Sequence, residues 1–431
     1  MKEVVKAYWR EKRKVYGIRN HVLILPTTAC VNRIAEIIWE EFKNVSWGEN
    51  GENRVVLARH SGGCTHVGFD EEIAFNALLG LGSHPNVYGV LLVSLGCGQF
   101  CKRPLLEGED KRENLAEFKL YDRLVKRGVK TYWVNIQEKV MFKRYSTSLE
   151  QAIDLGKRFV RKMVSEAESM KRQEVSLSHF VVGIGNGASD PTSGLFTNAA
   201  LGYVVDHFIR KGGTVVFSQT IEMLGAEGFI FRKIEKSRRR HVYRKIKRLL
   251  ETATVLKEAL QEYLGESDPT PGNIRSGIST LAEKSLGTML KIGHDPNIAI
   301  RDVLYFGEKI PRNGGLYLMD SPGMDIFSIS GMVAGGAHLV VFTTGMGTPV
   351  GSVVSPVIKV TTNKETFEKM PDIIDVYIPI ERIFEKGERL KDLSINILYP
   401  RILEVMSGET LSLAERRGQM DFDIRCYWLR A

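Results

Sequence analysis

Residues 181–194 read VVGIGNGASDPTSG, an apolar run that leads into three glycines at alternate positions. The spacing Gly183-x-Gly185-x-x-Ala188 matches a loose form of the dinucleotide-binding fingerprint. That fingerprint requires a helix to begin within the glycines and an acid about 20 residues further on, near the end of the next strand. Here the polar segment 189–194 intervenes before any helix, and the acid at the end of the next strand, Glu222, lies well beyond that spacing. The stretch therefore predicts a buried strand whose loop serves other chemistry.

Similar apolar runs recur on both sides of this stretch and alternate with helical patterns. In the first half they are HVLILPTT (21–28), RVVLAR (54–59), VYGVLLVSLG (87–96) and KTYWVNIQ (130–137), and in the second half HFVVGIG (179–185), TVVFSQT (214–220), GGLYLMDSPGMD (314–325) and GAHLVVFTTG (336–345). Such alternation specifies parallel strands joined by crossover helices. We predict an α/β protein with mainly parallel, Rossmann-like sheets flanked by helices.

The same pattern predicts two domains. A long charged helix, about 148–174, has no strand behind it, and its polar end MKRQEVSLS (170–178) is typical of a linker. We therefore assign residues 1–172 to a first α/β domain and residues 173–431 to a C-terminal α/β domain. Within the second domain, the Pro- and Gly-rich segment 268–277 is too polar and turn-rich for a helix or a strand.

Composition supports a folded protein with two cores. The chain has 431 residues, of which 43% are hydrophobic and 26% charged. No apolar run of signal-peptide type follows the basic N-terminus, and no run of about 18 apolar residues occurs, so we expect a cytoplasmic protein without a membrane segment. Five cysteines, an odd count, argue against a disulfide framework.

The chain carries a net charge of +9, and its densest basic cluster lies at residues 236–248. Such a cluster is the main argument for binding nucleic acid. However, Val242, Ile246 and Leu250 follow a helical period, which makes the cations the solvated face of an amphipathic helix. We favour that interpretation and do not expect nucleic acid as a partner.

Three cysteines follow predicted strands, at Cys30, Cys64 and Cys97. Strand ends of one parallel sheet lie along one edge, so the three thiols could converge with His60 and His66 on a metal ion. The alternative is that small apolar thiols fill tight loop corners, because no CxxC pair is present. The residues alone leave both interpretations open.

Several long motifs resemble one family. They are YGIRNHVLILPTTACVN (16–32), GGCTH (62–66), HPNVYGVLLVSLGC (84–97), IEMLGAEG (221–228), DPTPGNIRSGISTLAEKSLG (268–287) and the run from Gly315 to Asn363. From about residue 10 to its end, the chain resembles the catalytic region of the altronate/galactarate dehydratase family, which includes the large subunit of sulfolactate sulfo-lyase.

The resemblance implies metal-dependent removal of water from a sugar acid or another hydroxylated carboxylate, which yields a 2-keto-3-deoxy acid. The expected cofactor is Fe²⁺, with Mn²⁺ or Mg²⁺ as alternatives. Many members carry a small N-terminal β-clip domain, whereas the match begins almost at Met1. We therefore expect a separate small β-clip subunit as a partner, and self-association into a homo-oligomer as a further assembly.

The resemblance also assigns roles to individual positions. Catalytic roles fall on Asp190, Glu222, Glu283, Lys284 and Asp325, to which we add His66; substrate-binding roles fall on Ser189, Asn273, Thr348 and Lys359; metal-ligand roles fall on Cys30, Cys64, Cys97 and Asp320.

Two pairs among these positions have alternative explanations. Glu283 and Lys284 open a helix after a glycine-containing loop, which suits a general base and its orienting partner, or a surface ion pair. Asp320 and Asp325 flank a Ser-Pro-Gly turn, where they would ligate a metal or cap the next helix. A carboxylate substrate suits loops rich in backbone N–H groups, so the glycines at 183–187 are expected to face an anion or a metal.

The chain departs from the family pattern at five polar positions. Gly98 stands in place of an acid, Asn186 of a cysteine, Gly228 of a histidine, Met324 of an asparagine and Met346 of an arginine. Loss of an arginine removes a bidentate anchor for a carboxylate, which disfavours a diacid such as galactarate. The leading hypothesis is a hydro-lyase, and the alternative is a catalytically inactive or repurposed relative that binds an acidic metabolite.

Overall fold

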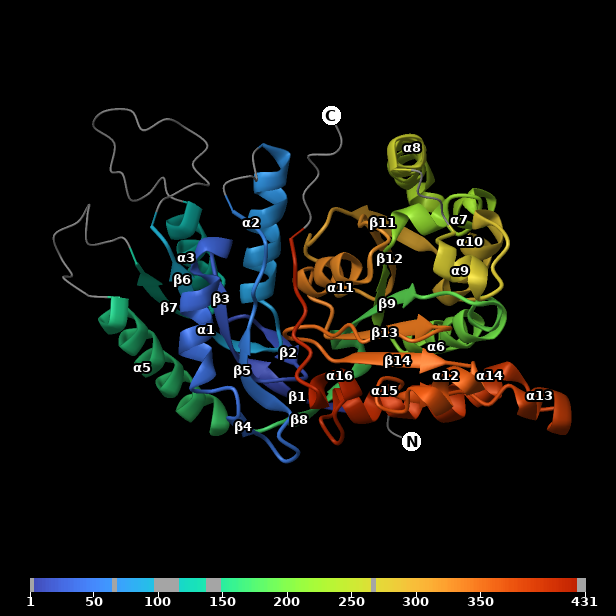
Figure 1. Ribbon diagram of the computed structural model, residues 1–431. Coiled ribbons are helices and arrows are strands. Elements are labelled where there is room, and N and C mark those ends of the chain that lie inside the picture. The colour runs from blue at the N-terminus through green and yellow to red at the C-terminus, as the bar shows by residue number, and fades with distance from the viewer. Residues whose placement is uncertain (1–3, 64–67, 97–115, 137–148, 265–268, 425–431) are drawn as a thin grey trace.

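The computed structural model describes residues 4–63, 68–96, 116–136, 149–264 and 269–424. Two parallel sheets lie side by side, each flanked by helices, with the N-terminal half of the chain forming one and the C-terminal half the other (Figure 1). The predicted α/β class with mainly parallel sheets is confirmed.

The first sheet has five strands in the order β4-β5-β3-β6-β7. They are β3 (His21–Pro26), β4 (Ser46–Trp47), β5 (Asn53–Leu57), β6 (Val87–Ser94) and β7 (Lys130–Asn135). All neighbours pair in parallel except β4, which runs antiparallel to β5 at the edge. Because β3 is buried along its whole length, it reads as a continuous apolar run rather than an alternating one.

Helices cover both faces of this sheet. They are α1 (Asn32–Glu40) and α5 (Leu149–Glu168) on one face, and α2 (Phe69–Gly82) and α3 (Ala116–Lys126) on the other. Successive side chains of a strand point to opposite faces of the sheet. Ile24 of β3 therefore packs on the face that α1 and α5 cover, and Leu23 on the face that α2 covers.

The second sheet is entirely parallel, with seven strands in the order β11-β12-β10-β9-β13-β14-β15. They are β9 (Val181–Gly187), β10 (Thr214–Phe217), β11 (Ile300–Leu304), β12 (Gly315–Met319), β13 (Leu339–Thr344), β14 (Val357–Thr361) and β15 (Val376–Tyr377). The stretch that begins at Val181 forms the central strand, with β10 and β13 as its neighbours. One face packs against α6 (Asn198–Arg210), α8 (Arg239–Leu264) and α15 (Tyr399–Met406).

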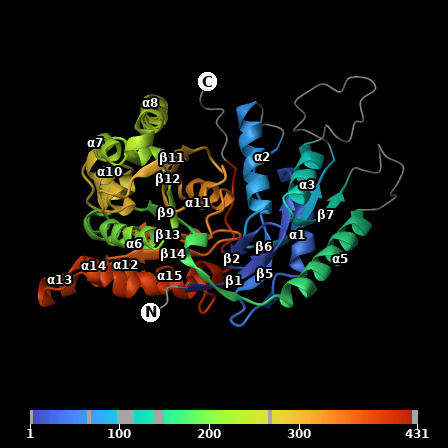
Figure 2. The same cartoon turned by 180° about the vertical axis from the view of Figure 1, so that it is seen from behind.

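The other face packs against α11 (Asp325–Ala334), and this packing joins the two halves. A single apolar cluster contains Leu23 of β3, Leu78 of α2, Met332 of α11 and Phe342 of β13. Figure 2 shows α2 and α11 between the two sheets. The helices approach closely, since a Cβ atom added at Gly80 of α2 would lie 2.1 Å from the carbonyl oxygen of Ala334.

The segment predicted to be a linker takes part in a third, antiparallel sheet. The segment 170–178 contains β8 (Gln173–Ser176), which pairs with β1 (Val4–Arg10), and β1 pairs in turn with β2 (Val15–Gly17). Sequence analysis missed β8 because three of its four residues are exposed and polar, so it shows no apolar run.

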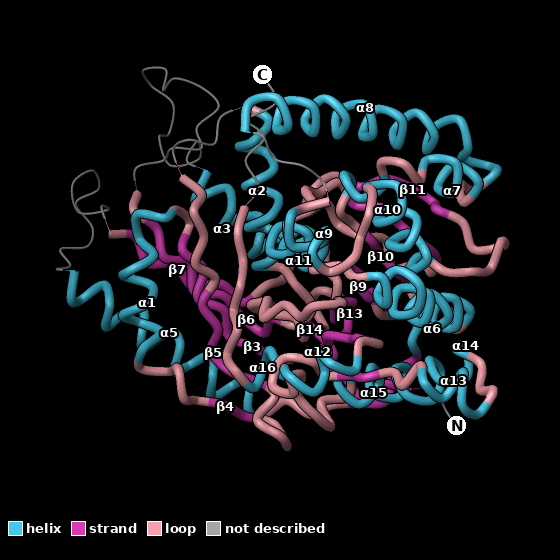
Figure 3. Tube along the Cα trace, turned by 45° about the vertical axis from the view of Figure 1, so that its right-hand side comes forward, coloured by secondary structure: helices cyan, strands magenta, loops and turns pink. Residues whose placement is uncertain are grey.

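The basic cluster lies in η5 (Lys236–Arg238) and the first turns of α8, the long helix that lies across one end of the second half (Figure 3). Val242, Ile246 and Leu250 are buried, which confirms the predicted apolar face, whereas Val255 is 66% exposed. The segment 268–277, predicted to be irregular, contains the short helix α9 (Pro271–Arg275). No helix in the described ranges has the length and apolar character needed to cross a membrane.

Candidate active site

Polar residues gather where the central strands of the second sheet end. The chain passes from β9 to β10 on one side and returns to β13 on the other, so the strand order reverses at β9. In open parallel sheets, ligands bind outside the carboxyl ends of the strands at such a reversal. The loop that follows β9 therefore occupies the expected position for a site. The glycines at 183, 185 and 187, expected in a loop that faces an anion or a metal, instead belong to the buried strand itself.

Two lysines and a glutamate form a buried ion cluster beyond this edge. They come from η4 (Thr220–Met223), α10 (Leu281–Met289) and η6 (Leu290–Ile292). The Nζ atom of Lys284 lies 3.5 Å from Oε1 of Glu222, and Nζ of Lys291 lies 4.0 Å from Oε2. The three side chains are 10% (Lys284), 5% (Glu222) and 0% (Lys291) exposed. Charges with so little access to water persist only when they are paired, so the cluster is an electrostatic unit.

Lys291 is held by two amide side chains. Its ammonium group donates hydrogen bonds to Oδ1 of Asn186 and, at 3.1 Å, to Oε1 of Gln219. Burial lowers the pKa of Lys291 to about 8, while Glu222 opposes this shift. A lysine with a depressed pKa at the edge of a sheet is typical of a functional site.

Gln219 has a strained backbone. Its φ of 75° places a non-glycine residue in the left-handed region, at the first residues after β10. Its side-chain amide accepts from the backbone N–H of Asn186 at 3.0 Å and donates to the backbone carbonyl of the same residue. Gln219 thereby fastens the end of β9 to the turn that carries Glu222, and this tie compensates for the strain.

Asp325 begins α11 and faces the same cluster. Its Oδ2 accepts a hydrogen bond from the hydroxyl of Thr348 at 2.9 Å. Burial raises the pKa of Asp325 to about 6; Glu222 adds to the rise, and Lys284 and Lys291 oppose it. A Cβ atom at Gly187 would lie 2.5 Å from Oδ2 of Asp325, so a glycine is needed where this carboxyl group meets β9.

A cavity of about 350 Å³ adjoins the cluster. Its lining includes Ser189, Asp190, Asn198, Lys284 and Thr288. Lys284 therefore faces both the cavity and Glu222. A space of this size suits a small-molecule ligand.

Hydrogen bonds within the protein hold the loop of Ser189 and Asp190, which lines this cavity. Asp190 accepts hydrogen bonds from the backbone N–H of Ser193 and the side-chain amide of Asn363, both at 2.7 Å, and is buried. Asn273 donates through its side-chain amide to the carbonyl of Ser189 at 3.1 Å. These contacts fix the loop after β9 and commit Asp190 to the protein's own groups.

Three expected residues lie apart from the ion cluster. Glu283 is exposed and accepts from the backbone N–H of Ser279 at 2.7 Å, which makes it an N-terminal residue of α10 rather than a partner of Lys284. The carboxylate of Asp320 accepts from the hydroxyl of Thr220 at 2.9 Å. Lys359, fully buried, donates to Gln419 at 3.3 Å, and burial lowers its pKa to about 8.

The described residues do not by themselves form a metal site. No group of three His, Cys, Asp or Glu side chains suited to a metal occurs among them. Cys30 is exposed after β3. Both ring nitrogens of His60 are engaged with backbone, at 2.8 Å from the carbonyl of Pro26 and 3.0 Å from the N–H of Gly62. The other candidates, Cys64, His66 and Cys97, lie outside the described residues.

Lys291 and Gln219 belong to the site in the structure but were not predicted from the sequence. Lys291 lies between Leu290 and Ile292 in an otherwise apolar segment, and a lone cation in such a setting is a recognisable signal. Asn186 was noted as a departure from the family pattern, and it contacts Lys291 directly.

Comparison with known proteins covers both halves of the chain. A family model described as "D-galactarate/Altronate dehydratase, C-terminal" matches residues 177–428, and one described as "D-galactarate dehydratase/Altronate hydrolase, second domain" matches residues 7–168.

Individual relatives show the same likeness. Altronate dehydratase of Bacillus subtilis (strain 168) is 34% identical over 83% of this chain, and altronate dehydratase of Escherichia coli (strain K12) is 31% identical over 86%. The chain spans about two thirds of these relatives, 66% and 68% of their lengths. The beta subunit of (2R)-sulfolactate sulfo-lyase from Chromohalobacter salexigens is 27% identical over 96% of this chain and 95% of its own. The chain therefore belongs to the D-galactarate/altronate dehydratase family.

Proposed function

We propose that the protein is a hydro-lyase that removes water from a sugar acid or another hydroxylated carboxylate. The observation that carries this proposal is the buried cluster of Glu222, Lys284, Lys291 and Asp325 beside a cavity at the carboxyl edge of the sheet. Two relatives are named altronate dehydratases, which supports the same reaction class.

The cluster supplies the groups that such a reaction needs. Dehydration breaks a C–H bond next to the carboxylate and the C–O bond of the β-hydroxyl, forms a carbon–carbon double bond, and releases water; the resulting enol becomes a 2-keto-3-deoxy acid. Charge accumulates on the substrate carboxylate as the proton leaves, and fixed cations stabilise that charge.

Individual roles follow from position. Lys284 faces the cavity, so we assign it to the C–H bond next to the substrate's carboxylate, where it accepts the proton in its neutral form. Asp325, with a pKa of about 6, is available in both protonation states near neutral pH and is assigned to protonate the leaving hydroxyl. Lys291 has no exposed surface, so it acts as a positioning residue that holds Glu222, whose Oε2 is buried without a hydrogen-bond partner in the described structure.

Metal dependence is a separate proposal. Cys30, Cys64 and Cys97, with Asp320, remain the candidate ligands, and a divalent ion such as Fe²⁺ would polarise the substrate's carboxylate when bound. The backbone N–H of Ala29 donates to the carbonyl of Gly62 at 2.8 Å, which ties the loop of Cys30 to the segment before Cys64. Metal analysis after anaerobic purification tests this proposal; a Cys30→Ser protein with unchanged metal content would contradict it for Cys30.

A partner subunit is also proposed. The sulfolactate sulfo-lyase relative is named as a beta subunit, and the match covers nearly all of it. We therefore propose that this chain works with a small β-clip subunit. Co-expression with such a subunit followed by size-exclusion chromatography tests the complex; separate elution of the two chains would contradict it.

The activity is tested with a panel of sugar acids and other hydroxy acids. The protein is purified without oxygen, supplied with Fe²⁺ or Mn²⁺ and with a small β-clip subunit, and formation of 2-keto acid is followed. Product from at least one acid is expected. Absence of product from every acid would favour an inactive relative that binds an acidic metabolite.

The role of Lys284 is tested by Lys284→Met. We expect kcat/KM to fall by about 10²–10³-fold, because the group that accepts the proton is lost. Lys233→Met is the matched control, since Lys233 is also largely buried and its Nζ donates to the carbonyl of Asp295 at 3.0 Å, in the same half of the chain. Equal losses in the two variants would contradict the assigned role.

A further inference from the structure

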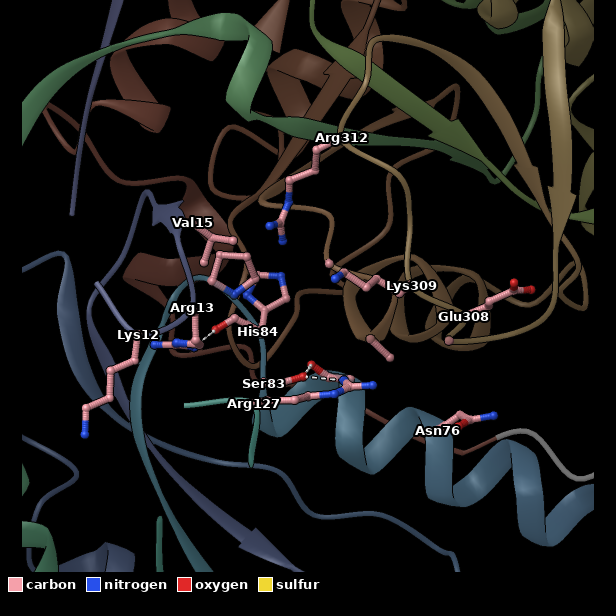
Figure 4. A pocket seen from close by; sticks show the side chains of 16 residues that line it. Lys12, Arg13, Val15, Asn76, Ser83, His84, Arg127, Glu308, Lys309 and Arg312 are labelled. Atoms are coloured by element: carbon pink, nitrogen blue, oxygen red, sulfur yellow. Dashed lines mark hydrogen bonds between the residues drawn. The ribbon is translucent and has the colours of Figure 1, made fainter. Parts of the chain in front are cut away.

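A second cavity lies at the opposite edge of the sheets, between the two halves of the chain (Figure 4). Its volume is about 420 Å³. The lining comes from the β1–β2 hairpin, the end of α2, the segment after α3, the β11–β12 loop and the end of α11. It begins where β6 and β13 start, so it is separate from the candidate active site at their carboxyl ends.

The charges that line this cavity are almost all positive. The cationic side chains are Lys12, Arg13, Arg127, Lys309 and Arg312. Three come from the first half of the chain and two from the second. Glu308 is the one acidic lining residue in the described structure, and its carboxylate accepts from the backbone N–H of Tyr305 at 2.8 Å. Figure 4 shows this carboxylate turned away from the guanidinium of Arg312.

Structural contacts account for part of this charge. Arg13 donates to the carbonyl oxygens of His84, at 3.0 Å, and Val87, and Arg127 donates to the hydroxyl of Ser83 at 2.9 Å. These bonds hold the turn between α2 and β6. They explain why Arg13 and Arg127 are present, whereas no contact with a described residue accounts for the side-chain charges of Lys309 and Arg312.

Arg312 is the group that points to a ligand. Its Nε is buried and has no hydrogen-bond partner in the described part of the chain. Burial lowers the pKa of Arg312 to about 10, so its guanidinium stays charged at neutral pH. No hydrogen bond or ion pair with another described residue is made by this guanidinium, and its partly exposed side chain lines the cavity, where an anion can meet its charge.

The buried imidazole of His84, beside these cations, carries no charge. Nε2 of His84 donates to the carbonyl of Ala337 at 3.0 Å. Burial lowers the pKa of His84 to about 3, and the charges of Arg312 and Arg13 contribute to the same direction. The side chain is therefore neutral, and the positive potential in the cavity is not offset.

We propose that this cavity binds a small molecule with at least two phosphate or carboxylate groups, which bridges the two halves of the protein. Cations from both halves of the chain, Lys12 and Arg127 from the first and Lys309 and Arg312 from the second, match separate anionic groups. The lining offers few apolar side chains, so binding energy comes from charge-assisted hydrogen bonds. Binding is independent of the proposed dehydratase activity.

Isothermal titration calorimetry at low ionic strength tests the proposal with three probes, inorganic pyrophosphate, citrate and ATP. We expect at least one probe to bind. Arg312→Gln and Lys309→Met should each weaken that binding by about tenfold or more, because each removes a charge-assisted contact. Lys309 is exposed, so its replacement tests the site without disturbing the core.

Arg389→Gln is the matched control. It removes the same net charge at an exposed ion pair with Asp392, far from the cavity in the sequence. Unchanged affinity in this variant, with weakened affinity in Arg312→Gln and Lys309→Met, supports the cavity as the site. No binding of any probe at millimolar concentration, or equal affinity in all three variants, overturns the proposal. The probe that binds identifies whether phosphates or carboxylates are recognised.

Discussion

At the scale of single residues, burial decides the chemistry of the candidate site. Lys291 has no exposed surface and contacts two amide oxygens, while Asp325 is pressed against Gly187. Desolvation moves the two pKa values toward neutrality from opposite sides, to about 8 and about 6. Groups that titrate near neutral pH are suited to moving protons in a reaction.

The raised pKa of Asp325 predicts a pH-dependent stability difference. The carboxyl group of Asp325 has a pKa of 3.8 in the unfolded chain and about 6 in the folded protein. The stability that the protonated group contributes is fully present below pH 3.8 and is lost as the pH rises through 6. Asp325→Asn cannot ionise and should be more stable than the unmodified protein at pH 7.5, by on the order of 1–3 kcal/mol. Urea unfolding measures this difference.

At pH 4 the same comparison serves as the control. The folded carboxyl group is then largely protonated, so the two proteins should differ little in their free energy of unfolding. A variant that is less stable than the unmodified protein at pH 7.5 would show that Asp325 is ionised favourably in the folded state.

At the scale of elements, the end of a strand and the start of a helix position the site. β9 ends in Gly187, and α11 begins with Asp325 directly against it. The short helix α9 forms despite its turn-rich sequence, because Thr270 accepts a hydrogen bond from the backbone N–H of Asn273 and Pro271 occupies the first helical position. Local composition therefore understates how much regular structure surrounds the site.

Gly187→Ala tests the contact between β9 and α11. The added methyl group would lie 2.5 Å from Oδ2 of Asp325 and should displace the carboxyl group. We expect kcat/KM to fall at least about tenfold, because displacement of a reacting group by about 1 Å is costly. Full activity in this variant would argue against a role for Asp325.

Gly228→Ala adds the same methyl group at a position where there is open space, and so serves as the comparison for Gly187→Ala. A Cβ atom at Gly228 in α7 (Glu227–Arg232) meets no atom within 4 Å. The substitution should raise the free energy of unfolding by about 0.5–1 kcal/mol, since alanine is favoured over glycine within helices. Thermal and urea unfolding check this result, and a destabilised protein would contradict it.

At the scale of the whole molecule, the C-terminal segment fastens the two halves together. Nε and Nη2 of Arg19 contact the two carboxylate oxygens of Glu415 in α16 (Leu413–Arg416) at 2.7 and 3.1 Å. Arg19 is fully buried and also donates to the carbonyl of Val405 at 2.9 Å. Because residues almost 400 positions apart share this network, the halves should unfold together.

Arg19→Met tests this connection. Loss of one partner leaves Glu415 largely buried without its counter-charge, and we expect the free energy of unfolding to fall by about 3–5 kcal/mol. Urea unfolding measures the change. Arg389→Met, which breaks the exposed pair with Asp392, is the control and should cost at most about 1 kcal/mol. Equal effects would show that the buried network does not stabilise the interface.

Helices and strands were predictable where neighbouring residues in the sequence showed an apolar run or a helical spacing. The buried parallel strands were recognisable as apolar runs, and the amphipathic face of α8 from the spacing of Val242, Ile246 and Leu250. The strand β8 was not, because its residues are mostly exposed and its pairing with β1 spans most of the first half of the chain. The placement of the domain boundary at residue 172 stays a prediction.

Of the residues that form the candidate site, three were predicted from the sequence and a fourth was not. Glu222, Lys284 and Asp325 were selected and lie near one another, while Lys291 was missed. Glu283 was paired with Lys284 because the two are neighbours in sequence, yet the helix turns its carboxylate toward Ser279. The roles of all these residues remain proposals.

The sequence by itself determined the α/β class, the family and the polar character of the loops at the carboxyl edge, because periodicity and motifs are properties of neighbouring residues. Tertiary structure alone decided which polar side chains meet. Asn186, Glu222, Lys291 and Asp325 lie on segments far apart in the chain, and they converge because β9 lies between β10 and β13. The pKa values of Lys291 and Asp325 follow from that convergence, since desolvation depends on everything that surrounds a charge rather than on its neighbours in sequence.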